Sequence, residues 1–156
     1  MLDHLRITLV AVGRCKQGSE RDLFDHYMRR LSGKVTLKEV EDKSSGPAAQ
    51  RREREGALIL SALPKGAKVV ALDERGRPIT SRDFAKLLGQ WRDAGEQEVA
   101  FVIGGADGLS EAVRTRADKL ISFGAVTWPH LLVRGLLAEQ LYRAQSILGG
   151  HPYHRD

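Results

Sequence analysis

Side chains that could carry chemistry gather in the last third of the chain, which holds three of its five histidines. His130 follows Thr-Trp-Pro, and the last six residues include His151, Tyr153, His154 and Arg155. Chain termini usually fray, but this one is aromatic, cationic and stiffened by proline. We therefore expect a docked terminal arm that can offer a proton acceptor and a cation. No cysteine or acidic residue stands at ligand spacing from the terminal histidines, so no metal site is predicted there.

Two glycine-containing segments could form a pocket made largely of main-chain groups. Gly104 and Gly105 follow an apolar strand, and glycine permits close approach of the backbone to a ligand as well as positive φ. Residues 123–128 form a second such segment before a helix. Ligands collect at the carboxyl edge of open α/β sheets, and apolar walls with main-chain donors suit an adenine ring and a ribose. From the residues alone, a ligand-free turn and a buried connection with Trp128 in the core remain open alternatives.

The loop after the first expected strand has the glycine spacing of a phosphate-binding P-loop. Gly13 and Gly18 stand at the right separation, but Ser19 follows Gly18 directly and the lysine between them is missing. ATP hydrolysis is therefore excluded. No G-x-G-x-x-G follows any strand either, so a standard dinucleotide-binding fold is not predicted.

Hydrophobic patterns predict strands that alternate with helices. Strands are expected over 6–12, 34–40, 68–72, 99–103 and 120–123, and helices over 19–31, between 47 and 63, from 80 or 81 to 93, over 110–117 and over 131–148. Ser19 and either Thr80 or Ser81 are expected to cap helices, Gly33 to stop one, and residues 73–78 to form a loop. This alternation predicts an α/β fold with a largely parallel sheet covered on both faces. No linker or repeat interrupts the single domain expected over 1–156.

The composition is that of an ordinary globular domain with a basic balance. The chain has 156 residues, a net charge of +5 and one cysteine, Cys15, so no internal disulfide can form and a cytoplasmic location is expected. The apolar runs are too short to span a bilayer, and no membrane association is predicted. The basic balance favours a polyanionic partner. Arg51, Arg52 and Arg54 are candidates to contact phosphates, or else form a solvated helix face.

Several segments together resemble the ribosomal RNA large subunit methyltransferase H family, of the SPOUT class. The likeness runs in order through nearly the whole chain, and its most specific part extends from the Gly-Gly turn to the terminal His-Pro-Tyr-His. The matching segments are 9–13, 70–73, 101–105, 127–130, 139–144 and 151–155.

The resemblance implies a Rossmann-like, largely parallel sheet whose C-terminal part is tied into a trefoil knot. It implies transfer of a methyl group from S-adenosyl-L-methionine to N3 of a pseudouridine in 23S ribosomal RNA, on the assembled ribosome, by a metal-free homodimer. Two other functions remain open. One is a non-catalytic ribosome- or RNA-binding module of the same fold, and the other is a tRNA methyltransferase of the same class.

The resemblance also assigns roles to residues. The cofactor would be held by Leu72, Gly104, Gly105, Phe123, Gly124, Ala125, Val126, Thr127 and Trp128. The substrate would be met by Arg134, Tyr142, Arg143 and Tyr153, with His154, Arg155 and His130 as the catalytic set.

The N3 proton of the target base must leave, and we expect His154 to accept it, with His130 as the competing base. Arg155 or Arg134 would stabilise charge on the neighbouring carbonyl oxygens. The terminal arm is accordingly expected near the Gly104-Gly105 turn, or, in a dimer, at the pocket of the partner. Gly135 departs from the family pattern and is expected to weaken the last helix.

Overall fold

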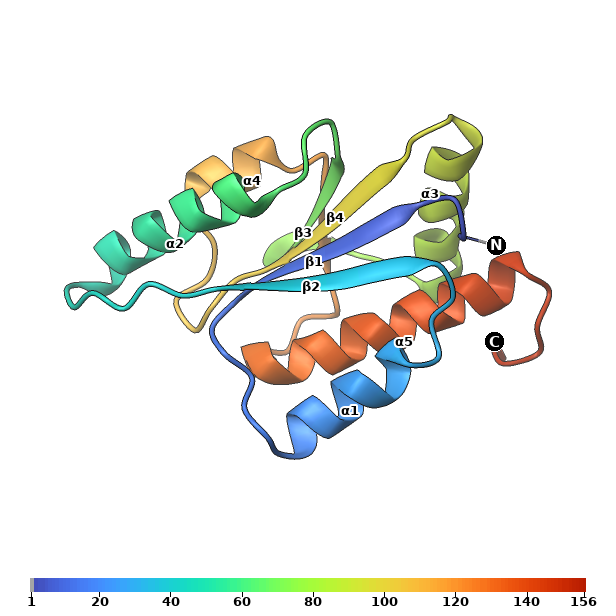
Figure 1. Ribbon diagram of the computed structural model, residues 1–156, viewed down its shortest axis with the longest axis horizontal. Coiled ribbons are helices and arrows are strands. Elements are labelled where there is room, and N and C mark those ends of the chain that lie inside the picture. The colour runs from blue at the N-terminus through green and yellow to red at the C-terminus, as the bar shows by residue number, and fades with distance from the viewer. Residues whose placement is uncertain (1) are drawn as a thin grey trace.

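A five-stranded parallel sheet forms the centre of the computed structural model, which describes residues 2–156 (Figure 1). The strands are β1 (Arg6–Val12), β2 (Lys34–Val40), β3 (Lys68–Pro78), β4 (Glu98–Ile103) and β5 (Lys119–Ser122), in the order β2-β1-β4-β3-β5. Every pairing between these strands is parallel, which confirms the predicted α/β class. Met1, the first residue of the single domain expected from the sequence, lies outside the described residues.

Helices cover both faces of the sheet, as parallel sheets require. They are α1 (Ser19–Met28), α2 (Ala48–Ala62), α3 (Ser81–Asp93), α4 (Glu111–Arg116) and α5 (His130–Leu148). One core joins the sheet to α1, α3 and α5 through Phe24, Phe84 and Leu141, and a second joins it to α2 and α4 through Ile59 and Val113. In Figure 1, α2 and α4 lie on one side of the strands, and α1 and α5 on the other.

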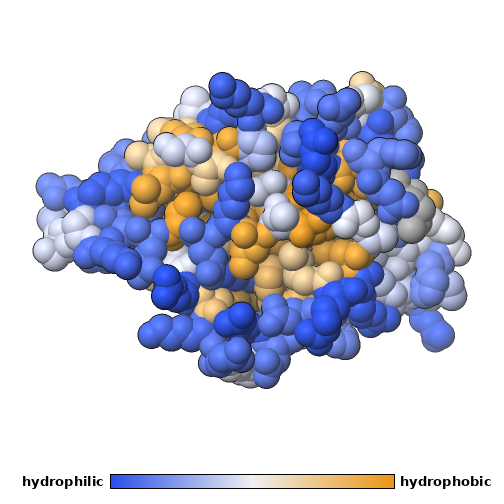
Figure 2. Space-filling view, viewed as in Figure 1, coloured by the Kyte–Doolittle hydropathy of each residue, from blue (hydrophilic) through white to orange (hydrophobic). Residues whose placement is uncertain are grey.

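Burial of the strands follows their place in the sheet. In β1 and β4, every residue after the first is buried, because these strands are flanked by neighbours and covered by helices. β2 is an edge strand in which Val35 and Leu37 are only half-buried and alternate with exposed residues. Figure 2 shows hydrophobic side chains gathered in the middle of the face that carries β2, with hydrophilic side chains around them.

The structure confirms the expected cap of α3 and contradicts both expected boundaries of α1. Thr80 caps α3 by accepting a hydrogen bond from the Asp83 N–H at 3.0 Å, as predicted. Ser19 is the first residue of α1 and not its cap, because Gly18 takes that position without a side-chain hydrogen bond. The same helix ends at Met28, five residues before the positive φ of Gly33.

The segment 73–78, predicted as a loop, instead continues β3. After a register shift between Leu72 and Arg77, the strand pairs with β5 again, and Pro78 lies opposite Ser122. A Cβ atom at Gly76 would stand 2.6 Å from the backbone carbon of Ile121. Glycine therefore permits a close approach of two backbones here, where the sequence had indicated a turn.

Gly135 has a similar role inside α5. A Cβ atom there would lie 2.8 Å from Leu23 Cδ2 of α1. The expectation that Gly135 merely weakens the helix is therefore incomplete, because its missing side chain lets α1 pack closely against α5.

Candidate functional site

A cavity of about 680 Å³ lies at the carboxyl ends of β4 and β5, beside Leu72 of β3. Leu72 of β3 pairs with Ile103 on one side and with Ile121 on the other, so the ends of β4 and β5 lie in one row with Leu72, while β3 itself continues to Pro78. Ligands bind at this edge of open α/β sheets. A cavity of this size can hold a nucleoside-sized molecule.

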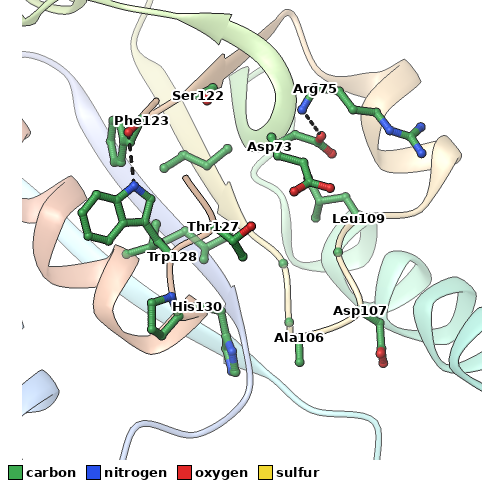
Figure 3. Close-up of a pocket in the computed structure, with 18 of the residues that line it drawn as sticks. Asp73, Arg75, Ala106, Asp107, Leu109, Ser122, Phe123, Thr127, Trp128 and His130 are labelled. Atoms are coloured by element: carbon green, nitrogen blue, oxygen red, sulfur yellow. Dashed lines mark hydrogen bonds between the residues drawn. The ribbon is translucent and has the colours of Figure 1, made fainter. Parts of the chain in front are cut away.

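Two segments face each other across this pocket (Figure 3). The turn that carries Ala106, Asp107 and Leu109 lies on one side, and the segment with Thr127 and Trp128 on the other. All of the residues expected to hold a cofactor line the pocket except Ala125. Sequence reasoning missed a group of charged lining residues: Asp73, Glu74, Arg75, Asp107 and Arg114.

The glycine pair is packed more tightly than its turn alone requires. Neither Gly104 nor Gly105 has positive φ, which in this turn occurs at Gly108 with φ 81°. A Cβ atom at Gly104 would lie 2.8 Å from Leu109 Cδ2, and one at Gly105 would lie 2.9 Å from Val12 Cγ1. The pair is thus needed for close approach within the protein and not for left-handed backbone.

The opposite wall is held by local hydrogen bonds. Ser122 Oγ donates to the Gly124 carbonyl at 2.7 Å, and the Trp128 indole N–H donates to the Phe123 carbonyl at 3.2 Å. Trp128 remains 41% exposed, and Val126 is 62% exposed. Trp128 is therefore not a core residue, and it presents an aromatic surface at the pocket.

A half-buried ion pair supports the glycine turn from β3 and α4. Arg114 Nη1 lies 3.1 Å from Asp73 Oδ2 and donates to the Leu109 carbonyl at 2.6 Å. The Asp73 side chain is only 6% exposed. No sequence motif predicts this ion pair, because its two residues are 41 positions apart.

Helix α2, which lies on the same face of the sheet as α4, contacts the same turn. Arg51 Nη1 lies 3.1 Å from Asp107 Oδ2, and Arg52 donates to the Asp107 carbonyl at 3.3 Å. Arg54 pairs instead with Asp42, at 2.8 Å. All three side chains are thus partly exposed and also bound to protein groups.

Glu55, four residues after Arg51 in α2, has a buried carboxyl group that lies against the Gly104-Gly105 turn. It is 7% exposed, and no hydrogen-bond partner for its Oε1 exists among the described residues. A Cβ atom at Gly105 would stand 3.5 Å from both of its oxygens. Burial, followed by repulsion from Asp107, raises the pKa of Glu55 above its ordinary value of 4.5.

We expect Glu55→Gln to stabilise the fold at neutral pH and not at acidic pH. Because the pKa of Glu55 is higher in the folded chain than in the unfolded chain, its stabilising contribution is lost as pH rises from about 4.5 through the folded-state pKa. Urea unfolding at pH 4 and at steps up to pH 8 measures the difference. A difference between the two proteins that does not change with pH would contradict this account.

His130 begins α5 at the rim of the pocket. A Cβ atom at Gly13 would lie 3.7 Å from its Nε2, so the ring stands between the pocket and the end of β1. Burial, with a smaller effect from the charge of Arg134, lowers the pKa of His130 below 6.5. The imidazole is therefore neutral at pH 7 and able to accept a proton.

Arg134 is expected from the sequence to face the substrate, but the structure buries it. Its side chain is 1% exposed and forms an ion pair with Glu39 at 2.5 Å. It also donates to the carbonyls of Gly13 at 3.0 Å and Val12 at 3.3 Å. Sequence reasoning placed it on a helix face and could not foresee that this face meets the ends of β1 and β2.

The terminal arm is docked, as expected, but at the other end of α5 from the pocket. Tyr153 packs edge-on against Tyr142, with ring centroids 4.7 Å apart, and Arg143 lies over its ring at 4.8 Å. Arg143 stands 13 residues after His130, about 20 Å along the helix. The expectation that the arm packs near Gly104-Gly105 is therefore wrong within a single chain.

His154 is engaged through both ring nitrogens. Arg143 donates to its Nδ1 at 3.1 Å, and its Nε2 lies 3.0 Å from Asp156. Because a guanidinium can only donate, Nδ1 accepts and the Nε2–H donates to the carboxylate. The Asp156 carboxylate also accepts hydrogen bonds from Arg82 Nε at 2.8 Å and from Arg82 Nη2 at 2.7 Å.

Tyr153 is also held in place by its neighbours. Burial, together with a hydrogen bond to Tyr27, raises the pKa of Tyr153 to about 12. Tyr142 accepts a hydrogen bond from Arg30 at 3.0 Å, and Arg143 pairs with Glu139 at 2.7 Å. The aromatic and cationic residues at this end of α5 thus form one packed cluster.

Residues 2–156 contain neither a metal-binding group nor a membrane-spanning helix. No group of three or more histidine, cysteine, aspartate or glutamate side chains is arranged there to hold a metal ion. No helix within the same range is long and apolar enough to cross a membrane.

Comparison with known proteins reveals relatives that span nearly the whole chain. Residues 5–154 match the family described as Predicted SPOUT methyltransferase. The chain is 62% identical over 151 residues to "Ribosomal RNA large subunit methyltransferase H" of Paramagnetospirillum magneticum, which covers 97% of this chain and 99% of that protein. Identity to the protein of the same name from Rhodospirillum centenum is 56% over 151 residues, with 97% and 99% covered.

Among solved structures, a probable methyltransferase from Bordetella pertussis Tohama I superposes with a TM-score of 0.62 at 18% identity. The match covers 92% of this chain and 99% of that one. At this level of identity the likeness concerns the fold alone.

Proposed function

This chain belongs to the SPOUT methyltransferases, in the ribosomal RNA large subunit methyltransferase H family, and from that premise we propose its substrate, cofactor and site. It is a methyltransferase. We propose that it transfers the methyl group of S-adenosyl-L-methionine to N3 of a pseudouridine in 23S ribosomal RNA on the assembled ribosome. Such a substrate would place the protein in the cytoplasm.

The observation that carries this proposal is the pocket at the ends of β4 and β5, beside Leu72 of β3. Its volume of about 680 Å³ suits a nucleoside cofactor. Leu72, Phe123 and Trp128 would pack on the adenine and ribose, and the backbone of the glycine turn would supply hydrogen bonds. When bound, the cofactor supplies a methyl group already activated by its sulfonium, so no metal is needed. The proposed trefoil knot would bring the two walls of this pocket together.

The protein's own groups must align the target base and remove its N3 proton. His130 is neutral at pH 7 and lies at the pocket rim, so it is one candidate base. His154 is the other, and it would have to exchange a contact with Arg143 or Asp156 for one with the base. Because Arg134 is buried and paired, Arg155 is the better candidate to stabilise charge on the carbonyl oxygens.

The position of the arm favours a homodimer. Within one chain, Tyr153 and His154 stand about 20 Å from the pocket rim along α5. A second copy with its α5 antiparallel to the first would bring each arm to the partner's pocket. Tyr153 could then stack on the target base, as aromatic side chains do with unpaired RNA bases. Tyr142 and Arg143 would hold the arm and adjacent RNA.

A methyl-transfer experiment tests the proposal. Purified protein is incubated with ribosomes from cells that lack the modification and with cofactor labelled in the methyl group. We expect the label to enter the large-subunit RNA. Cofactor binding by calorimetry without any transfer would instead favour a non-catalytic binding module.

A further inference from the structure

A second cavity, of about 360 Å³, lies at the carboxyl ends of β1 and β2. Its walls are the loop over residues 13–18, the first turns of α1, and the buried side of α5. Four basic side chains line it: Arg14, Lys16, Arg21 and Arg134. Two carboxylates line it as well, so its free charge depends on which cations are already paired.

Both carboxylates are committed to partners. Glu39 accepts from Arg134 at 2.5 Å and from the Cys15 N–H at 2.8 Å. Burial opposes its ionised form, but these hydrogen bonds outweigh burial and hold the pKa of Glu39 below 4.5. Asp25 lies 3.6 Å from Arg21, one helical turn away.

Two cations are left over. In the part of the chain that the structure describes, neither Arg14 nor Lys16 has a carboxylate within ion-pair distance. Arg14 makes only a longer-range attraction to Glu39. Both side chains are exposed, so they can turn toward a ligand in the cavity without leaving a buried partner. The cavity therefore carries an excess of about two positive charges.

Buried donors complete the site. Arg134 is 1% exposed, and its Nε has no hydrogen-bond partner among the described residues although the side chain lines the cavity. A buried donor of this kind costs free energy unless a ligand or water meets it. Arg21, from the first turn of α1, lines the same cavity and adds a further donor.

The ligand that fits is a phosphate group. We propose that this cavity binds a backbone phosphate of the RNA strand next to the target nucleotide, an inference that rests on the proposed function. His130 lines the first pocket, Arg134 lines the second, and one turn of α5, about 5.4 Å, separates them. Gly13 lies between the two cavities, within contact distance of His130. A nucleotide with its base at the first pocket can thus place a neighbouring phosphate in the second.

The single cysteine allows the site to be probed without methyl transfer. Cys15 lines the cavity, so the rate at which a thiol reagent modifies the protein reports on its occupancy. We compare protection by a short uridine-rich RNA, by uridine nucleoside and by inorganic phosphate. The proteins are the wild type, R14Q/K16Q, and the matched control K65Q/K86Q, whose exposed lysines lie elsewhere.

We expect the RNA to slow modification of Cys15 in the wild type and the control, and not in R14Q/K16Q, with no effect of the nucleoside. Protection is expressed as a ratio within each protein, because charge changes alter intrinsic thiol reactivity. Protection by inorganic phosphate but not by RNA would overturn the proposal in favour of a free-anion site. Absence of protection by either would overturn it as well.

Methyl transfer to ribosomes supplies a second test of the proposal. R14Q/K16Q is expected to raise KM for ribosomes by about tenfold with kcat and cofactor affinity unchanged, and to lower the salt slope of log KM by about 0.7 for one phosphate. Kinetics equal to those of the control would contradict the proposal. RNA protection of Cys15 in a wild type that transfers no methyl group would leave the phosphate site standing while the proposed function fails.

Discussion

A chain that ends at Tyr153 is expected to lose methyl transfer by at least about 100-fold while it binds the cofactor normally. Truncation removes His154 and Arg155, the proposed base and charge-stabilising group, together with Asp156. The pocket is untouched, because these residues lie at the far end of α5 within their own chain. The Arg82–Asp156 pair that is lost is exposed, so little stability goes with it. Calorimetry with the cofactor and labelled transfer to ribosomes measure the two effects.

Mixed dimers show whether the terminal arm acts at the pocket of its own chain or at that of its partner. The truncated chain, with an intact pocket, is combined with a full-length chain whose pocket is disabled by Gly104→Val. If each arm serves the partner's pocket, the mixed dimer contains one complete site and regains activity. An arm that acts on its own chain leaves no complete site, and a mixture without activity would refute the crossed arrangement. Full activity of the truncated chain alone would remove His154 and Arg155 from the mechanism.

The second large effect is expected at the glycine turn. Gly104→Ala should weaken cofactor binding at least about tenfold, equivalent to 1.4 kcal/mol. Its Cβ atom would stand 2.8 Å from Leu109 Cδ2 and 3.1 Å from the Gly108 backbone carbon. Leu109 is 2% exposed and cannot move aside, so the turn itself must shift. Cofactor calorimetry and thermal unfolding on the same samples give affinity and stability.

Gly95→Ala is the matched control. Gly95 has φ 86° with open space around it, in the connection that leads into the amino end of β4. Alanine there should lower stability through backbone strain and leave cofactor affinity unchanged. Equal losses of affinity in both variants would mean that Gly104 acts through global stability and not through the shape of the pocket.

The alternation of strands and helices was predictable because local patterns determine it. The continuous apolar runs of β1 and β4 require burial on both sides, and a parallel sheet covered by helices provides that. The carboxyl edge then follows as the place for a ligand, and the loops at 104 and 123 fall on it. The end of β3 was missed, since Gly76 and Pro78 look like a turn until β5 lies against them.

The charged parts of the site could not be predicted, because each depends on contacts between distant segments. Glu55 stands in a very polar helix, and nothing in its neighbours indicates that its carboxyl group faces Gly105. Arg134 looks like a solvated arginine on α5, yet it is buried against Glu39, 95 positions away. The composition of the terminal arm predicted that it is docked, but the position at which it docks depends on the length of α5.

The most direct test identifies the methylated nucleoside. Labelled cofactor is supplied with assembled ribosomes, free large subunits or tRNA. The modified nucleosides are then separated and identified by mass spectrometry. The proposed function predicts N3-methylpseudouridine in 23S RNA, formed on assembled ribosomes in preference to free subunits. Label that appears only in tRNA, or on a different nucleoside, would contradict the proposed function.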